Sequence, residues 1–284
     1  MTPSPPPSKL GIALRVGLYA LIGWLSLVIS ATLMVWILGV RDTLFVIAAL
    51  STFAAAALAN AIVVRIYERG RLSDLGLGWT STAPREFFIG AGIAAGAAVI
   101  ILAGPWAVGA AHFESARGSD HPWSSLIFIG VVLLFGAAGE EMLFHGYAFQ
   151  LLIRSLGAFA TILPTSVIFG LAHRGNQNAS NLGIFNTILW GVLLGYAYWR
   201  TKALWLPIGL HFGWNFALPL FGVNLSGFTM GVMGYALRWN AGDLWSGGGY
   251  GPEGSVLTTA IVVVLFVLVQ RVFPERFQES RFQE

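Results

Sequence analysis

The chain is poor in charge and contains no cysteine. Only 10% of its 284 residues are Asp, Glu, Lys or Arg, against about 25% in ordinary soluble domains. A soluble domain of this length needs far more polar surface to cover one core, so the soluble, secreted, disordered and coiled-coil classes are excluded. The absence of cysteine excludes a disulfide framework, a thiolate nucleophile and a Cys-ligated metal. A net charge of +3 is too small and too dispersed for a nucleic-acid partner.

What the chain has instead is apolar sequence, with 56% hydrophobic residues and a mean hydropathy of +0.72. A helix that crosses a bilayer needs about 20 mainly apolar residues. On that scale the sequence predicts eight transmembrane helices, over 16–40, 43–65, 87–111, 125–152, 156–173, 180–199, 203–223 and 255–273. We therefore expect an all-α polytopic membrane protein with one transmembrane domain over 16–273. A disordered, proline-rich tail over 1–15 precedes it and a C-terminal tail over 274–284 follows it.

The distribution of Lys and Arg predicts the orientation in the membrane. Twelve of the 16 lie in the two tails and in connections on the same side as the tails, and four lie on the other side. Because cytoplasmic connections carry the excess of positive charge, we expect both termini in the cytoplasm. The membrane is expected to be a bacterial or archaeal plasma membrane.

Glycine is abundant, and some of it falls at the spacing of close helix packing. Gly92 with Gly96, and Gly191 with Gly195, are expected to let neighbouring helix backbones approach. The glycine-rich stretch 224–255 is expected to be an external loop that partly contacts the membrane interface through its tryptophans. A lid that gates access of a substrate is the alternative for this stretch.

Ionisable side chains inside the expected spans are few and concentrated. Such a group costs several kcal/mol at mid-membrane unless it is paired or hydrated, so each one needs a reason. Glu140 and Glu141 are adjacent in the fourth span, whereas the other eleven acidic residues fall in expected connections or tails. His145, His173 and His211 lie in the fourth, fifth and seventh spans. We therefore expect an active site formed by helices 4, 5 and 7.

The spacing of these residues supports one shared site. Residues four apart lie on the same face of a helix. Three pairs have this spacing, namely Glu141 with His145, Phe169 with His173, and His211 with Asn215. A lone intramembrane histidine is more often a satisfied hydrogen bond between helices, but two carboxylates, three imidazoles and one carboxamide within about 75 residues favour a functional cluster.

The residue types suit hydrolysis of an acyl bond, above all a peptide bond. Glu140 in a low-dielectric cavity can act as a general base, with His173 sharing the proton of an activated water. His211 and Asn215 can supply N–H donors for the oxyanion of a tetrahedral intermediate. Since no Ser, Thr or Lys stands beside a base, covalent catalysis is less favoured.

Two other readings of the same residues stay open. His173, His211 and one Glu form a possible zinc set, although the chain lacks His-Glu-x-x-His; a metal-free site without a cofactor is favoured, with zinc as the alternative. A proton- or cation-coupled transporter using Glu140, Glu141 and His173 is the alternative from another class. A noncatalytic membrane scaffold would leave the carboxylate pair unexplained.

The motifs resemble those of a known family. The order Glu-Glu-x-x-x-Arg, Phe-x-x-x-His and His-x-x-x-Asn on successive membrane helices is the pattern of the CAAX-protease and bacteriocin-processing family, also called CPBP or Abi, of intramembrane endopeptidases. In this sequence the three motifs begin at Glu140, Phe169 and His211. The resemblance covers about residues 125–223, the expected catalytic core.

The resemblance implies an eight-helix intramembrane protease. It implies that Glu140 and His173 activate water, that His211 and Asn215 hold the oxyanion, and that Glu141 orients the site. Both a zinc enzyme and a metal-free glutamic protease have been argued for the family. The implied partners are the lipid bilayer and a membrane-embedded or lipidated peptide, such as a prenylated C-terminal peptide, a secreted leader or a sorting tail.

One position departs from the family pattern, because His145 replaces the arginine that closes the first motif. Arginine is a permanent bidentate cation, whereas histidine is shorter and can be neutral. We expect His145 to pair with Glu141 and to support the site from behind. Phe169 is expected to pack and to shape the pocket.

Overall fold

The computed structural model describes residues 7–39 and 44–274. The helices of the bundle are α1 (Lys9–Leu38), α2 (Leu44–Tyr67), α3 (Ala83–Ala107), α4 (Pro122–His145), α5 (Tyr147–Leu156), α6 (Ala158–Ala172), α7 (Asn181–Thr201), α8 (Trp205–Leu220) and α10 (Val256–Val272). Short helical turns are η1 (Leu72–Leu75), η2 (His173–Gly175), α9 (Asp243–Ser246), η3 (Gly248–Tyr250) and η4 (Pro252–Gly254). The strands are β1 (Ala111–Ser115) and β2 (Tyr235–Trp239). The expected all-α polytopic membrane fold is confirmed.

The first helix begins earlier than the sequence analysis places it. Ser8 caps α1 by accepting a hydrogen bond from the Gly11 backbone N–H at 3.1 Å, which satisfies one of the free donors of the first turn. Residues 9–15, assigned to the tail, are therefore helical. Residues 1–6 of the expected N-terminal tail and 275–284 of the C-terminal tail lie outside the described residues.

The helices differ in length. Among the described residues, α1, α2, α3, α7 and the nearly continuous α4–α5 stretch are long and apolar enough to cross a membrane. The expected spans over 156–173, 203–223 and 255–273 are occupied by α6, α8 and α10, with 15, 16 and 17 residues. These three helices are shorter than the about 20 residues of a full crossing.

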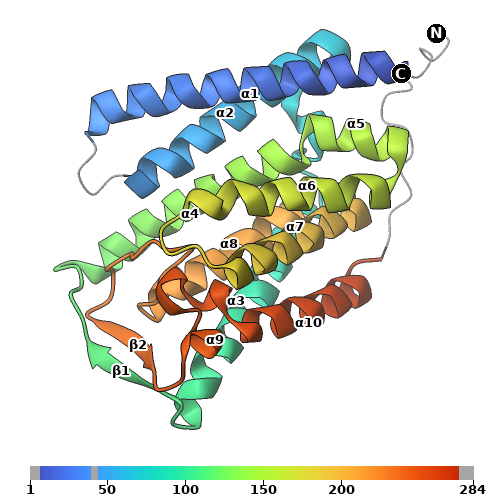
Figure 1. Ribbon diagram of the computed structural model, residues 1–284. Helices are drawn as coiled ribbons and strands as arrows, with labels where there is room; N and C mark the ends of the chain where they lie inside the picture. The colour runs from blue at the N-terminus through green and yellow to red at the C-terminus, as the bar shows by residue number, and fades with distance from the viewer. Residues whose placement is uncertain (1–6, 40–43, 275–284) are drawn as a thin grey trace.

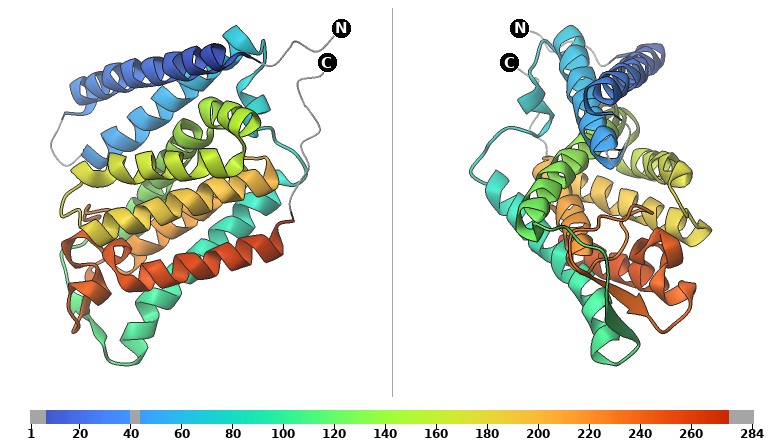
Figure 2. Two further views of the ribbon diagram at one scale, coloured as in Figure 1. Left: turned by 45° about the vertical axis from the view of Figure 1, so that its right-hand side comes forward. Right: turned by 90° about the vertical axis from the view of Figure 1, so that its left-hand side faces the viewer.

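The bundle consists of a two-helix hairpin on one side and a group of packed helices on the other. Figure 1 shows α1 and α2 as a hairpin on one side of α4, while α7 and α8 lie among α3, α6 and α10. In Figure 1 and in the left view of Figure 2, the start of α1 and the end of α10 lie at the same end of the bundle. The β1–β2 sheet lies at the opposite end (Figures 1 and 2).

The expected fourth span is two helices and not one. Gly146 leaves the helical conformation, with φ −76° and ψ −142°, and separates α4 from α5. The carbonyl of Met142, which a continuous helix would use, accepts hydrogen bonds from Tyr19 Oη at 3.0 Å and Asn60 Nδ2 at 2.9 Å. The Tyr147 N–H donates to Asn60 Oδ1 at 2.8 Å. These side chains satisfy the backbone groups that the break releases.

The stretch 224–255 is folded against the bundle, and it contains a strand that the sequence did not predict. β2 pairs antiparallel with β1, from Ala111 opposite Trp239 to Ser115 opposite Tyr235. The buried Asn186 of α7 donates to the carbonyls of Glu253 at 2.7 Å and Ser255 at 2.8 Å. The expected simple external loop is therefore a packed segment.

One of the two expected glycine contacts is wrong. Built Cβ atoms at Gly92 and Gly96 meet no heavy atom within 4 Å, so these glycines face open space. α3 instead approaches α8 closely at a glycine of α8, because a Cβ at Gly213 would lie 2.1 Å from Ala91 O of α3. The expected contact at Gly191 is confirmed, since a Cβ there would lie 3.0 Å from Ser166 Cα of α6.

Gly139 brings α4 against α2 directly before the acidic pair. A Cβ at this position would lie 2.6 Å from the Phe53 backbone N. Gly139→Ala therefore must push the helices apart, and we expect it to lower the free energy of unfolding by about 1–3 kcal/mol. Gly96→Ala is the matched control, because its Cβ meets open space and alanine favours the helix by about 1 kcal/mol over glycine.

Reversible denaturation of the two variants in the same detergent measures this difference. A Gly139→Ala protein as stable as the Gly96→Ala protein would contradict the close α2–α4 contact.

Candidate active site

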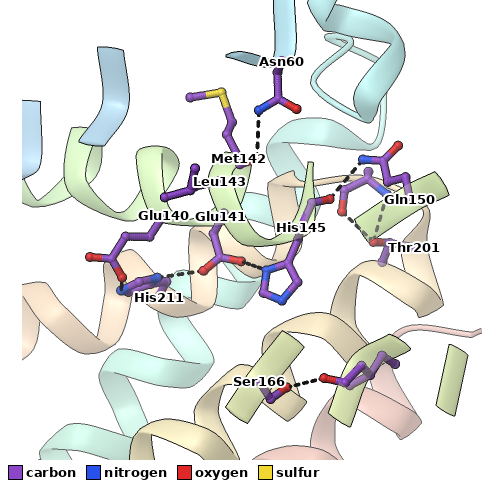
Figure 3. A network of polar contacts seen from close by, with 12 residues as sticks. Asn60, Glu140, Glu141, Met142, Leu143, His145, Gln150, Ser166, Thr201 and His211 are labelled. Atoms are coloured by element: carbon purple, nitrogen blue, oxygen red, sulfur yellow. Dashed lines mark hydrogen bonds and ion pairs between the residues drawn. The ribbon is translucent and has the colours of Figure 1, made fainter. Parts of the chain in front are cut away.

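The centre of the site is the buried carboxylate of Glu141. It accepts hydrogen bonds from His145 Nδ1 at 2.7 Å and from His211 Nδ1 at 2.8 Å, one on each oxygen (Figure 3). His145 lies one turn further along α4, whereas His211 comes from α8. Glu141 is 0% exposed, so both bonds form away from bulk water, where they are stronger. The carboxylate thus fixes α8 to α4.

His145 lies behind the site and does not line the cavity. Its ring packs edge-on against Phe149, with centroids 4.8 Å apart. A Cβ at Gly195 of α7 would lie 3.4 Å from His145 Nε2, so the glycine leaves room for the ring. Gln150 Nε2 donates to the His145 carbonyl at 3.1 Å and to the Leu75 carbonyl at 3.0 Å, which holds the end of α4. His145 therefore acts on the site through Glu141.

Glu140 points in a different direction from Glu141. Its Oε2 lies 3.7 Å from His173 Nε2 and 3.9 Å from His211 Nε2. Within the described residues this oxygen is buried and has no hydrogen-bond partner. A buried carboxylate oxygen without a partner is costly. Glu140 therefore presents an acceptor suited to a group from outside the protein, such as a water molecule.

The backbone around His173 fixes the tautomer of its ring. His173 follows the last residue of α6, and its Nδ1–H donates to the Phe169 carbonyl at 2.8 Å. In the neutral ring the proton on Nδ1 leaves a lone pair on Nε2. The same reasoning applies to His211, whose Nδ1 donates to Glu141. The Nε2 atoms of two imidazoles and one carboxylate thus converge on one point.

Phe169 supports the imidazoles by packing as well as through its carbonyl. Its ring lies edge-on to Phe144 at 5.0 Å and to His211 at 6.3 Å between centroids, and tilted against His173 at 4.8 Å. The side chain is buried. The i, i+4 pair of Phe169 and His173 is therefore a packing and hydrogen-bonding unit.

A cavity of about 350 Å³ contains the chemistry. Glu140, His173, His211 and Asn215 line it, with Asn215 one turn beyond His211 on α8. Most of the other lining residues are apolar, and they include Leu27, Phe45, Leu133, Phe169 and Trp190, each from a different helix. A cavity of this size, with a few polar groups in an apolar wall, is typical of a binding site for an organic ligand.

Sequence reasoning missed two buried carboxyl groups by assigning them to connections. Glu86 lies in the first turn of α3 and is 1% exposed. Glu253 belongs to η4, in the glycine-rich segment, and lines the cavity. Neither position has a hydropathy signal, because each stands beside an apolar span and not within one. The buried Asn60 and Asn186 lie inside expected spans. A polar side chain within an apolar span marks such positions, but they were missed because only ionisable residues were considered.

The described residues include no group of three or more His, Asp or Glu side chains arranged to hold a metal ion. Glu140, His173 and His211 converge without meeting that arrangement.

Residues 122–217 match the family model described as type II CAAX prenyl endopeptidase, Rce1-like. The match runs from α4 into α8 and includes the acidic pair and the residues of the three motifs, namely Glu140, Glu141, His145, Phe169, His173, His211 and Asn215. No curated protein matches the chain.

Proposed function

We propose that this protein hydrolyses a peptide bond of a membrane-associated substrate with water activated by Glu140 and His173. Its apolar helices make it an integral membrane protein, and residues 122–217 match the model of the CAAX prenyl endopeptidase family. The observation that carries the proposal is the unpartnered Glu140 Oε2 beside the acceptor nitrogen of His173. The match of residues 122–217 to an endopeptidase family supports hydrolysis of a peptide bond as the type of reaction.

The proposed reaction starts with a water molecule beside Glu140. One proton of the water passes to the Glu140 carboxylate while the oxygen attacks the peptide carbonyl carbon, and His173 Nε2 orients the water as a second acceptor. Glu140 then gives the proton to the amide nitrogen as the C–N bond breaks. The carboxyl product keeps the water oxygen, and Glu140 returns to its starting state.

The oxyanion is held from α8. Asn215 carries N–H donors at all pH values, whereas His211 can donate from Nε2 only when its ring carries both protons, because Nδ1–H is directed to Glu141. Such donors lower the barrier by stabilising the charge that develops in the transition state. We assign Asn215 and His211 to this role and Glu141 to holding His211.

The proposed substrates are lipidated or transmembrane peptides. The apolar wall of the cavity, which includes Leu27 of α1 and Phe45 of α2, suits an acyl or prenyl chain better than a polar peptide. The matched family is that of type II CAAX prenyl endopeptidases, and a prenylated peptide is therefore the first substrate to test.

The proposed membrane is a bacterial or archaeal plasma membrane, with the start of α1 and the end of α10 at the cytoplasmic side. The excess of Lys and Arg on that side supports this orientation. His173 lies at the end of α6 that is distant from the start of α1 (Figure 1).

Glu140→Gln tests the proposed base. Glutamine keeps the shape but cannot accept a proton, so we expect cleavage of a fluorogenic peptide, with a prenylated cysteine three residues from its C-terminus, to fall by at least about 100-fold. The assay uses purified protein in liposomes. Glu114→Gln is the matched control, because Glu114 lies exposed on β1, where it pairs with Arg238, and it should cleave like the wild type.

Undiminished cleavage by the folded Glu140→Gln protein would show that Glu140 is not the general base. A proton or cation flux through the same liposomes, lost on this substitution without any peptide cleavage, would instead support a transporter.

Removal of metal tests the cofactor. In the proposed mechanism the chain's own carboxylate is the base, so wild-type protein dialysed against a strong zinc chelator should retain its kcat. Metal content is measured in the same samples. Loss of activity on chelation, with recovery on addition of zinc, would contradict the metal-free mechanism.

A further inference from the structure

The 224–255 segment brings a third carboxyl group to the cavity. Glu253 lies in η4 and lines the same cavity as Glu140, His173 and His211. It is 9% exposed. It comes from outside the residues of the family match, which ends at 217, so no role for it is implied by that match.

Hydrogen bonds to both the side chain and the backbone of Glu253 fix its position. Its side-chain Oε2 accepts from the Ser226 N–H and from Ser226 Oγ, the latter at 2.9 Å. Its backbone carbonyl accepts from Asn186 Nδ2 at 2.7 Å, and Asn186 Oδ1 in turn accepts from Thr259 Oγ1 at 2.6 Å. α7 and α10 therefore clamp η4, and the carboxyl group is held in place over the cavity.

Glycines allow the segment to pack this closely. A Cβ at Gly183 of α7 would lie 2.7 Å from the ring of Tyr250, and Gly251 adopts a φ of +101° that a side chain rarely allows. The Tyr250 carbonyl accepts from the Gly227 N–H at 2.8 Å. The segment is thus built as a wall of the cavity.

Both hydrogen bonds from Ser226 end on Oε2, and the indole of Trp214, which also lines the cavity, is a further donor beside this carboxyl. Several titratable groups face this carboxyl, namely His173 of η2, His211 of α8, Tyr250 of η3 and, across the cavity, Glu140 of α4. Burial raises the pKa of Glu253 above its ordinary value, and this effect exceeds the lowering by the Ser226 hydrogen bonds and by His173. The same carboxyl, together with burial, raises the pKa of Tyr250 to about 12. A protonated carboxyl has an O–H to donate.

Resting on the proposed peptidase function, we propose that Glu253 is a substrate-contacting residue whose carboxyl O–H donates a hydrogen bond to a backbone carbonyl of the bound peptide. The contact gives the site a polar anchor on the wall opposite α4, next to the scissile bond. It belongs to binding and not to the transfer of the water proton, which Glu140 carries.

Binding is measured apart from cleavage. In the Glu140→Gln background the prenylated fluorogenic peptide remains intact, so its Kd can be followed by fluorescence anisotropy between about pH 5 and 9. Because only the protonated carboxyl donates, binding should weaken as the pH rises through the pKa of Glu253. Adding Glu253→Gln should remove this part of the pH dependence, since an amide donates at every pH while its oxygen can still accept from Ser226.

Glu253→Ala, in the same background, removes the donor altogether and should raise the Kd at low pH by about 3- to 10-fold. Glu114→Gln, in the same background, is the matched control and should keep both the Kd and its pH dependence. The histidines are the same in all four proteins, so the comparison isolates Glu253.

An identical pH dependence with Glu and with Gln at position 253, or an unchanged Kd in Glu253→Ala, would overturn the proposal, as would a complete lack of peptide binding. Cleavage by the wild type, lost in Glu140→Gln, is scored separately. Failure of that cleavage refutes the proposed function, whereas cleavage with a pH-independent contribution from Glu253 refutes only this inference.

Discussion

The site depends on one buried carboxylate that accepts hydrogen bonds from two helices. Glu141 holds His145 at 2.7 Å and His211 at 2.8 Å. Removing one partner of such a group leaves the rest buried and unpaired, which typically costs about 3–5 kcal/mol for an ion pair. Because Glu141 fixes the Nδ1–H of His211, it also decides which nitrogen of that ring faces Glu140.

A broken helix and small residues make this arrangement possible. The α4 helix ends at His145, and carbonyls that it releases accept hydrogen bonds from Tyr19 and Asn60. Gly139 lets α2 approach the helix just before the acidic pair. The chemistry therefore sits at an interruption of regular structure, where backbone and side-chain groups of α1 and α2 compensate for the lost helical bonds.

The membrane fold could be predicted, because apolar length and the cost of charge in lipid are properties of local sequence. So could the convergence of the fourth, fifth and seventh expected spans, which are α4, α6 and α8 in the structure. The i, i+4 spacing of Glu141 and His145 likewise predicts their contact. The break at Gly146 could not be predicted, since it depends on Asn60, 86 residues earlier in the chain. Glu253 was missed for the same reason: only the clamp from Asn186 and the pairing of β2 with β1 bring its segment to the cavity.

The central claim is that Glu141 acts on the reaction through His211, and a double-mutant cycle on kcat/KM tests it most directly. The prenylated peptide is assayed with the wild type, Glu141→Gln, His211→Gln and the double variant. If Glu141 works by holding His211, the double variant should lose little more activity than His211→Gln alone, with a coupling free energy of about 1–3 kcal/mol. Losses that simply multiply would contradict the account.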